Sequence, residues 1–230
     1  MKRVLLSWSS GKDSAWTLHV LRQQPDIEVI GLLTTLNQEF QRVAMHSTRR
    51  ALLEAQAAAA GLPLWTIPLP WPCSNEIYEH RMAKACSRAA RERVDAIAFG
   101  DLFLQDVRDY RLKRLADTGL EPLFPLWGIP TDQLARAMID GGLRARLTCV
   151  DPQQIPASFA GRAFDASLLR DLPSSADPCG ERGEFHTCVY EGPMFNTAIP
   201  IEAGAIVERD GFVYADFSSR SEEVLVAASR

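Results

Sequence analysis

The sequence predicts an α/β protein, in which a doubly wound parallel sheet is followed by a smaller C-terminal α+β domain. Short apolar runs alternate with segments of helical spacing between residues 4 and 99. These runs are apolar throughout, which is typical of parallel strands that helices cover on both faces. Three prolines and Trp127 then cluster at residues 122–130. We place the domain boundary there and divide the chain into residues 1–127 and 128–230.

Strands and helices alternate in the first domain. Pro25 ends the first expected helix, Ser47 and Ser74 can cap the next two, and Gly61 follows the second. We expect strands at residues 4–6, 29–33, 64–67 and 95–99, and helices at residues 15–21, 47–60 and 74–93.

The second domain has a different pattern. A short helix is expected to begin at Thr131 or Asp132, and a strand is expected at residues 144–150. Residues 173–183 are rich in Pro, Ser and Gly and predict a loop. Apolar residues flank Asp210-Gly211 on both sides, which predicts a β-hairpin.

The composition is that of an ordinary globular protein, with 47% hydrophobic and 23% charged residues. The formal net charge of −4 disfavours a nucleic-acid-binding protein, because such proteins carry a basic surface. No apolar stretch approaches the length of a membrane span, and the N-terminal run is too short for a signal peptide. We therefore expect a cytoplasmic protein that binds neither nucleic acid nor membranes.

Cysteine and histidine spacing argues against two kinds of covalent or metal stabilisation. The chain has five cysteines without a CxxC pair, and four histidines without paired ligand spacing. These counts disfavour a disulfide framework and a structural zinc site. We expect free thiols, mostly buried, and no metal held by the protein's own histidine or cysteine clusters.

The strongest motif follows the first expected strand. A glycine-bearing loop between a strand and a helix directs backbone N–H groups at one point, where helix polarity favours an anion such as phosphate. Gly11 allows close approach because it has no Cβ. The motif matches neither GxxxxGK[ST] nor GxGxxG, and a serine-rich turn that only caps the helix is the alternative. The loop consists of Ser9, Ser10, Gly11, Lys12, Asp13 and Ser14.

The segment VLLSWSSGKDSAW resembles the SGGxDS loop of ATP pyrophosphatases in the adenine nucleotide alpha hydrolase superfamily, whose fold is HUP/Rossmann-like. The similarity extends in order over about residues 3–200, to the diphthine–ammonia ligase-like (diphthamide synthase-type) subgroup. Ser10 departs from the pattern, since the subgroup has a glycine there. A serine with positive φ costs about 1 kcal/mol or more. The other matching segments are residues 45–49, 99–101, 123–127, 179–187 and 191–195.

This resemblance implies a two-step reaction that uses ATP and Mg²⁺. A carboxylate of a small-molecule or protein acceptor attacks the α-phosphate, pyrophosphate leaves, and ammonia then displaces AMP to give an amide. The resemblance implies catalytic roles for Lys12, Asp13 and Glu184. A carboxylate at Glu184 would bind the incoming amine or accept its proton, or would hold a cationic part of the substrate.

Further residues are expected beside the loop because the carboxyl ends of parallel strands meet in one crevice. Nucleotide contacts are expected at Thr34, Thr35, Gly100 and Asp101, in addition to Ser9, Ser10, Gly11 and Ser14. Strand packing and an ordinary turn are the alternatives. Acceptor contacts are expected at His46, Arg49, Glu181, His186 and Thr187.

Three of these acceptor candidates belong to a polar segment around Glu184, which we expect to be a loop because Gly180 and Gly183 flank it. The segment is too dense in polar groups for ordinary core packing. A solvated loop is its alternative. For Arg49, the alternative is a solvated helix face. A basic group follows the fourth strand and is expected to form the polar side of one helix. Its members are Arg108, Arg111, Lys113 and Arg114.

Two other functions remain open. A tRNA-modifying ATP pyrophosphatase would adenylate a base, although such thiolating enzymes often use paired cysteines. A non-enzymatic nucleotide-binding protein could share the fold, although the polar segment around Glu184 argues against it. A homodimer is compatible with each of these functions.

Overall fold

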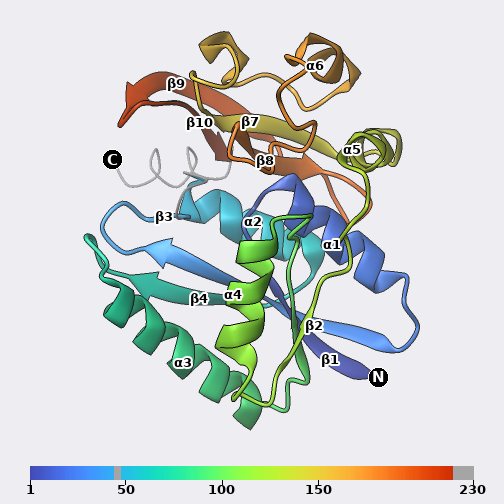
Figure 1. The fold of residues 1–230 in the computed structure, drawn as a ribbon, viewed down its shortest axis with the longest axis vertical. Helices are drawn as coiled ribbons and strands as arrows, with labels where there is room; N and C mark the ends of the chain where they lie inside the picture. Colours follow the sequence, from blue (N-terminus) through green and yellow to red (C-terminus); the bar gives the residue numbers. More distant parts are fainter. Residues whose placement is uncertain (44–47, 220–230) are drawn as a thin grey trace, which may run out of the picture.

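The computed structural model describes residues 1–43 and 48–219 (Figure 1). Its first half is a six-stranded sheet in which β4, β2, β1, β5 and β6 run parallel in that order, and the short β3 pairs antiparallel with the end of β2. The strands are β1 (Lys2–Ser7), β2 (Ile27–Asn37), β3 (Arg42–Val43), β4 (Leu64–Leu69), β5 (Ala96–Ala98) and β6 (Glu121–Leu123).

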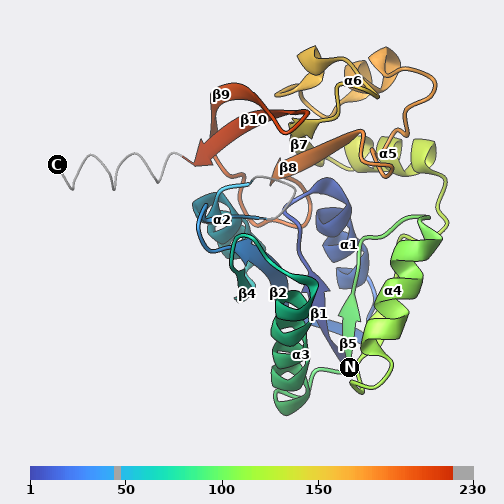
Figure 2. The same cartoon turned by 60° about the vertical axis from the view of Figure 1, so that its left-hand side comes forward.

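Helices cover both faces of this sheet, because successive residues of a strand point to opposite sides. Val4 and Leu6 of β1 belong to one buried cluster, whereas Leu5 belongs to another. The helices α1 (Lys12–Arg22) and α2 (Arg50–Ala60) pack on the first face. The helices α3 (Asn75–Arg91) and α4 (Gln105–Leu115) cover the second face (Figure 2).

The second half forms an antiparallel sheet with the order β8-β7-β10-β9. Figure 1 shows this sheet between α1 and α2 on one side and α6 on the other. The first buried cluster continues from β1 into this sheet, so one apolar core joins the two halves. The elements are α5 (Thr131–Asp140), β7 (Arg144–Val150), a 3-10 turn (Ala157–Phe159), α6 (Ala166–Asp171), β8 (Phe185–Glu191), β9 (Ile201–Arg209) and β10 (Phe212–Ser219).

The predicted fold class is confirmed: a doubly wound parallel sheet is followed by a smaller α+β part. Ser74 caps α3 through a 3.3 Å hydrogen bond from the Ile77 amide, and Gly61 ends α2 in the left-handed conformation. Asp210 and Gly211 both have positive φ, as a two-residue hairpin turn requires. The boundary at residue 127 stays a prediction.

Several element ends differ from the prediction. α1 begins at Lys12 rather than at residue 15, because the loop of residues 9–14 itself turns into the helix. α3 ends at Arg91 instead of residue 93, since Arg93 has a φ of 57° and cannot continue a right-handed helix. Ser47, expected to cap α2, lies outside the described residues, and α2 begins at Arg50.

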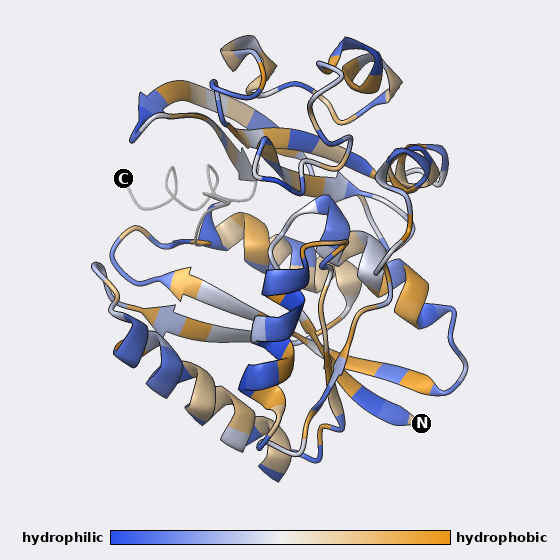
Figure 3. Ribbon diagram, viewed as in Figure 1, coloured by the Kyte–Doolittle hydropathy of each residue, from blue (hydrophilic) through white to orange (hydrophobic). Residues whose placement is uncertain are grey.

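α4 is mostly hydrophilic (Figure 3), and Leu115 is its buried residue. Its polarity agrees with the helix face expected for the basic group. Within residues 1–43 and 48–219, every helix is too short or too polar to cross a membrane.

Candidate active site

A cavity of about 230 Å³ lies where three segments from different parts of the chain meet. The first is the loop between β1 and α1, the second follows β5, and the third precedes and begins β8. We call this space the polar cavity. The predicted residues on its wall are Ser9, Lys12, Asp13, Ser14, Gly100, Asp101, Glu181, His186 and Thr187.

The loop turns sharply at Ser10, which has a φ of 71° and is fully buried. The structure therefore shows the left-handed conformation at the position where Ser10 replaces a glycine. The hydroxyl of Ser10 is 2.7 Å from the Thr48 hydroxyl. Its carbonyl accepts hydrogen bonds from the Val189 amide and the Gln56 side chain, both at 3.0 Å. These contacts hold the strained residue in place and turn its side chain away from the polar cavity.

Hydroxyl oxygens accept hydrogen bonds from the backbone amides at the start of α1. The Lys12 amide donates to Thr187 Oγ1 at 3.1 Å, and the Gly11 amide donates to Ser9 Oγ at 3.4 Å. The Ser14 hydroxyl donates to the Gly11 carbonyl at 3.0 Å. A phosphate oxygen can replace such a hydroxyl, because it is a stronger acceptor for the same N–H groups.

Lys12 is nearly inaccessible to solvent, with 2% of its surface exposed. Its ammonium group donates to Asp13 Oδ2 at 2.9 Å and to the Cys179 carbonyl oxygen. Burial favours the neutral amine, but the attraction of Asp13 and the other nearby acidic groups outweighs it and raises the pKa of Lys12. The polar cavity therefore keeps one buried positive charge.

Asp13 carries an unpartnered oxygen on the same wall. Its Oδ2 pairs with Lys12, whereas its buried Oδ1 has no hydrogen-bond partner. Burial raises the pKa of Asp13 against the opposing effect of Lys12. The helix is not capped by this side chain. Gly100 keeps the wall close, since a Cβ there would lie 2.9 Å from the Asp13 carbonyl carbon and the Ser14 amide nitrogen.

Two more carboxylates face this space. Glu181 accepts a 2.9 Å hydrogen bond from the Leu102 amide, and burial raises the pKa of Glu181 to about 7. Asp101 lies 3.4 Å from the Nε of Arg111, and burial raises its pKa although Arg111 opposes the shift. Residues 1–43 and 48–219 contain no group of three or more histidine, cysteine, aspartate or glutamate side chains that could hold a metal ion by themselves.

The polar segment around Glu184 is folded into the protein and is not a solvated loop. Glu184 is 1% exposed, and its two carboxylate oxygens accept backbone hydrogen bonds from Asp177 at 2.7 Å and Arg182 at 3.0 Å. It lies outside the wall of the polar cavity. The geometry therefore favours a structural role for Glu184 over the expected contact with the acceptor.

His186 and Thr187 are strand residues, because β8 pairs with β7 along residues 185–191. Their place in a strand corrects the expectation of a loop, and both line the polar cavity. Burial and the neighbouring Lys12 charge lower the pKa of His186 to about 4. His186 is therefore neutral near pH 7.

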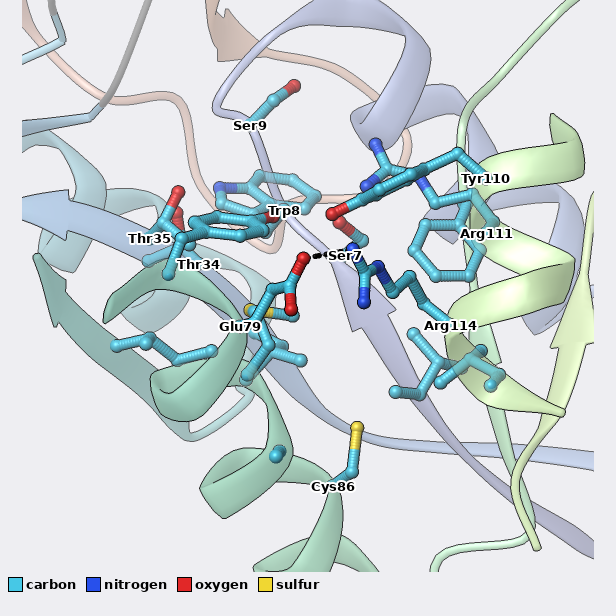
Figure 4. Close-up of a pocket in the computed structure, with 18 of the residues that line it drawn as sticks. Ser7, Trp8, Ser9, Thr34, Thr35, Glu79, Cys86, Tyr110, Arg111 and Arg114 are labelled. Atoms are coloured by element: carbon cyan, nitrogen blue, oxygen red, sulfur yellow. Dashed lines mark hydrogen bonds and ion pairs between the residues drawn. The ribbon is translucent and has the colours of Figure 1, made fainter. Parts of the chain in front are cut away.

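A second, larger cavity of about 640 Å³ lies between the parallel sheet and the helices α3 and α4. We call it the apolar cavity, because leucine, isoleucine and aromatic side chains form much of its wall. Thr34 and Thr35 lie at the end of β2 on this wall, on the side opposite α4 (Figure 4). The buried hydroxyl of Thr34 has no hydrogen-bond partner.

One predicted acceptor residue lies elsewhere. Arg49 is outside both cavities and pairs with Asp216 of β10 at 2.5 Å, which Arg42 also contacts at 2.8 Å. Burial of Asp216 opposes its ionisation, but the hydrogen bonds from both arginines lower its pKa to about 2. Arg49 thus joins α2 to the second sheet. His46 falls outside the described residues.

Sequence reasoning did not identify three residues that organise the site. Gln56 is fully buried and joins the loop of residues 9–14 to β8. Asp177 accepts hydrogen bonds from the amides of Cys179 and Glu181 and so shapes the third segment. Arg111 lines both cavities. A buried glutamine or aspartate has no distinctive spacing, so the chain pattern could not reveal the first two.

Comparisons with known proteins cover both halves of the chain. The model of the diphthamide synthase N-terminal domain matches residues 1–121, and that of the diphthamide synthase C-terminal domain matches residues 130–217. The diphthine–ammonia ligase of Bos taurus is 23% identical over 235 residues, which cover 93% of this chain and 88% of the bovine protein.

Two solved structures resemble part of the chain, each with a TM-score of 0.39. One is a predicted subunit of tRNA methyltransferase from Methanocaldococcus jannaschii, with 17% identity over 59% of this chain and 73% of that chain. The other is the U34-tRNA thiolase NcsA from Methanococcus maripaludis with its [4Fe-4S] cluster, with 18% identity over 60% of this chain and 56% of that chain.

The N-terminal family model by itself matches residues 1–121 of the 230, more than half of the chain, and the C-terminal model matches most of the rest. The chain therefore belongs to the diphthamide synthase family, a family of ATP-dependent ligases.

Proposed function

We propose that the protein forms an amide from a carboxylate and ammonia, and that it activates the carboxylate by adenylation with ATP. One observation carries this proposal: the phosphate loop, the turn after β5 and the segment before β8 line one polar cavity, which adjoins a larger apolar cavity. The two cavities share part of their walls, so a nucleotide can place its base in one and its phosphates in the other. The bovine relative, a diphthine–ammonia ligase, supports the same reaction class.

The reaction has two steps. In the first, a carboxylate oxygen of the acceptor bonds to the α-phosphorus, and the bond from that phosphorus to the bridging oxygen breaks. Pyrophosphate leaves with the electron pair. In the second, the ammonia nitrogen bonds to the activated carbonyl carbon, AMP leaves, and a base accepts the surplus proton. The acceptor is a small molecule or a protein side chain.

ATP suits the walls of both cavities. The apolar cavity offers the unpartnered hydroxyl of Thr34, which is a hydrogen-bond partner for a polar edge of the base. The polar cavity offers the amides at the start of α1 and the buried ammonium of Lys12. We assign the β- and γ-phosphates to this loop, with Ser9, Gly11 and Ser14 as contacts and Ser10 holding the turn.

Mg²⁺ also suits the polar cavity. Carboxylate oxygens are its preferred protein ligands, and the buried Asp13 Oδ1 has no other partner. We assign Asp13 to Mg²⁺, with Asp101 on the same wall as a second carboxylate. When bound, the ion would neutralise charge on the departing pyrophosphate.

Glu181 is our candidate for the base of the second step. Its carboxylate faces the polar cavity, and burial raises its pKa to about 7. A base whose pKa lies near the working pH exchanges protons most effectively. This proposal transfers to Glu181 the role expected for Glu184, whose oxygens are bound to backbone amides.

The reaction class can be tested with Mg-ATP and a metabolite pool, using phosphorus NMR to identify the products. We expect AMP and pyrophosphate to accumulate when the pool contains the acceptor. ADP and phosphate would refute the proposal. Adenylation of a tRNA base by ATP, with no amide product, would favour the tRNA-modifying alternative.

A matched pair of variants tests the assignment of Asp13. Asp13→Asn should raise the Mg²⁺ concentration that gives half-maximal pyrophosphate release by about 10-fold or more, because a charged ligand is lost. Asp132→Asn is the control, since Asp132 is also the second residue of its helix but is exposed. Equal Mg²⁺ dependence in the two variants would contradict the assignment.

A second pair separates Glu181 from Glu184. Glu181→Gln should slow amide formation by about 10²-fold, the usual effect of losing a positioned base, and should leave ATP binding unchanged. Glu184→Gln should lower the melting temperature, because one carboxylate oxygen is replaced by an NH2 group, a donor that would face a backbone N–H. Parent-like amide formation by a folded Glu181→Gln variant would refute the role of Glu181.

A further inference from the structure

Arg111 lies at the junction of the two cavities. Four residues line both of them: Ser7, Ser9, Phe99 and Arg111. Arg111 is the charged member of this group. In Figure 4, the side chains of Tyr110, Arg111 and Arg114 extend from α4 into the space opposite Trp8 and Thr34.

Contacts from the segment that follows β5 hold the guanidinium in this position. Its Nε donates to Asp101 Oδ2 at 3.4 Å, and its central carbon lies 4.8 Å from the centre of the Phe99 ring. Arg111 also lies close enough to Tyr78 of α3 for its charge to lower the pKa of that hydroxyl, against the larger opposing effect of burial. A guanidinium has five N–H donors, so these contacts still allow it to bind an anion.

We propose that Arg111 binds the α-phosphate of the nucleotide. This inference rests on the proposed function, which places the base in the apolar cavity and the β- and γ-phosphates in the polar cavity. The α-phosphate joins these parts of ATP and must therefore lie where the cavities meet. Arg111 is the cation at that point.

An arginine suits this place chemically. Attack of the acceptor carboxylate on the α-phosphorus increases the negative charge on the non-bridging oxygens, and the planar guanidinium can donate two parallel hydrogen bonds to them. A donor held beforehand stabilises this charge more than a mobile one does. Asp101 and Phe99 provide that support.

Arg108 is a natural control on the same helix. It also stacks on aromatic rings, with its central carbon 5.3 Å from the Phe124 ring centre and 4.6 Å from the Trp127 ring centre. Unlike Arg111, it lines neither cavity. A general effect of removing a stacked arginine from α4 should appear in both variants, whereas loss of a phosphate contact should appear only at Arg111.

The test compares the binding of adenosine, AMP, ADP and ATP to the full chain by isothermal titration calorimetry in one magnesium-containing buffer. We expect Arg111→Gln to weaken AMP, ADP and ATP by a similar factor, about 10- to 100-fold, since a hydrogen bond to a charged group is lost. Adenosine should bind as it does to the parent. Arg108→Gln should leave all four affinities within about 2-fold of the parent values.

Each other result overturns the inference. A loss of affinity confined to ADP and ATP would place Arg111 at the β-phosphate. An equal loss of affinity for adenosine would show a structural role. Unchanged AMP binding would show that Arg111 makes no phosphate contact. A parent protein that binds none of the four ligands would refute the proposed function itself, and this inference with it.

Arg111→Lys keeps the test decisive if the glutamine variant does not fold. Lysine retains the charge but cannot donate in the same two-pronged geometry. We expect AMP affinity to fall by a smaller factor, with adenosine affinity unchanged. Parent-like AMP binding by Arg111→Lys, together with an unfolded Arg111→Gln, would identify Arg111 as a residue that supports the fold.

Discussion

Gln56 connects the loop of residues 9–14 to the second sheet, and replacing it by leucine should destabilise the protein strongly. Its Oε1 accepts from Trp8 Nε1 at 2.9 Å, and its amide nitrogen donates to the carbonyls of Ser10 at 3.0 Å and Val189 at 2.7 Å. The side chain is fully buried. All three partners require this orientation of the amide, because an N–H group faces the oxygen and two carbonyls face the nitrogen.

The expected magnitude follows from what leucine leaves behind. The Ser10 carbonyl keeps a partner, since the Val189 amide donates to it at 3.0 Å. Trp8 Nε1 and the Val189 carbonyl lose the glutamine, and an unsatisfied buried group costs about 1–3 kcal/mol. With some compensation from the added apolar surface, we expect a loss of about 2–4 kcal/mol in the free energy of unfolding. The melting temperature should fall by about 5–15 °C.

Urea unfolding followed by tryptophan fluorescence measures this change. Glu54→Leu on the exposed face of the same helix is the control, because its 2.8 Å ion pair with Arg50 is solvent-exposed. Such a pair contributes about 0–1 kcal/mol. If Gln56→Leu unfolds within about 1 kcal/mol of the parent, the hydrogen bonds to Gln56 do not join the two halves as argued.

Three further predictions concern charge and backbone conformation. Between its ordinary pKa of 4.5 and the folded value of about 7, Glu181 keeps its proton only in the folded protein, so parental stability should fall with rising pH in this window relative to Glu181→Gln in urea titrations. Asp216 has the opposite sign: its folded pKa is about 2, so the advantage of the parent over Asp216→Asn should be complete above pH 3.8 and disappear as the pH falls through about 2. Gly180→Ala should destabilise the protein more than Gly183→Ala, because both have positive φ but only the Cβ at Gly180 would lie 2.8 Å from the Phe185 carbonyl; equal melting temperatures would exclude that contact.

The local pattern of the chain was sufficient for the doubly wound sheet. The apolar runs of β1, β2 and β4, the cap at Ser74 and the turn at Asp210-Gly211 each depend on neighbours a few residues away. Periodicity and turn chemistry are local properties, so the sequence reveals them. The same holds for the loop before α1, whose glycine and hydroxyl residues are consecutive.

The exact ends of elements depended on longer-range contacts. His186 and Thr187 looked like loop residues because they are polar, yet pairing with β7 makes them part of a strand. Glu184 looked exposed for the same reason, but two backbone amides compensate its buried charge. Such compensation depends on partners that the local sequence pattern does not specify.

The sequence by itself therefore determined the fold class, the position of the glycine-bearing loop before α1 and the family resemblance, since each rests on consecutive residues. Only the tertiary structure decided that the Glu181 carboxylate faces the polar cavity and that the Glu184 carboxylate binds backbone amides beside it. It also placed Arg49 against Asp216 and Arg111 at the junction of the cavities. The physical reason is that a charged side chain acquires its role from burial and from its partners, and both are set by segments far apart in the chain.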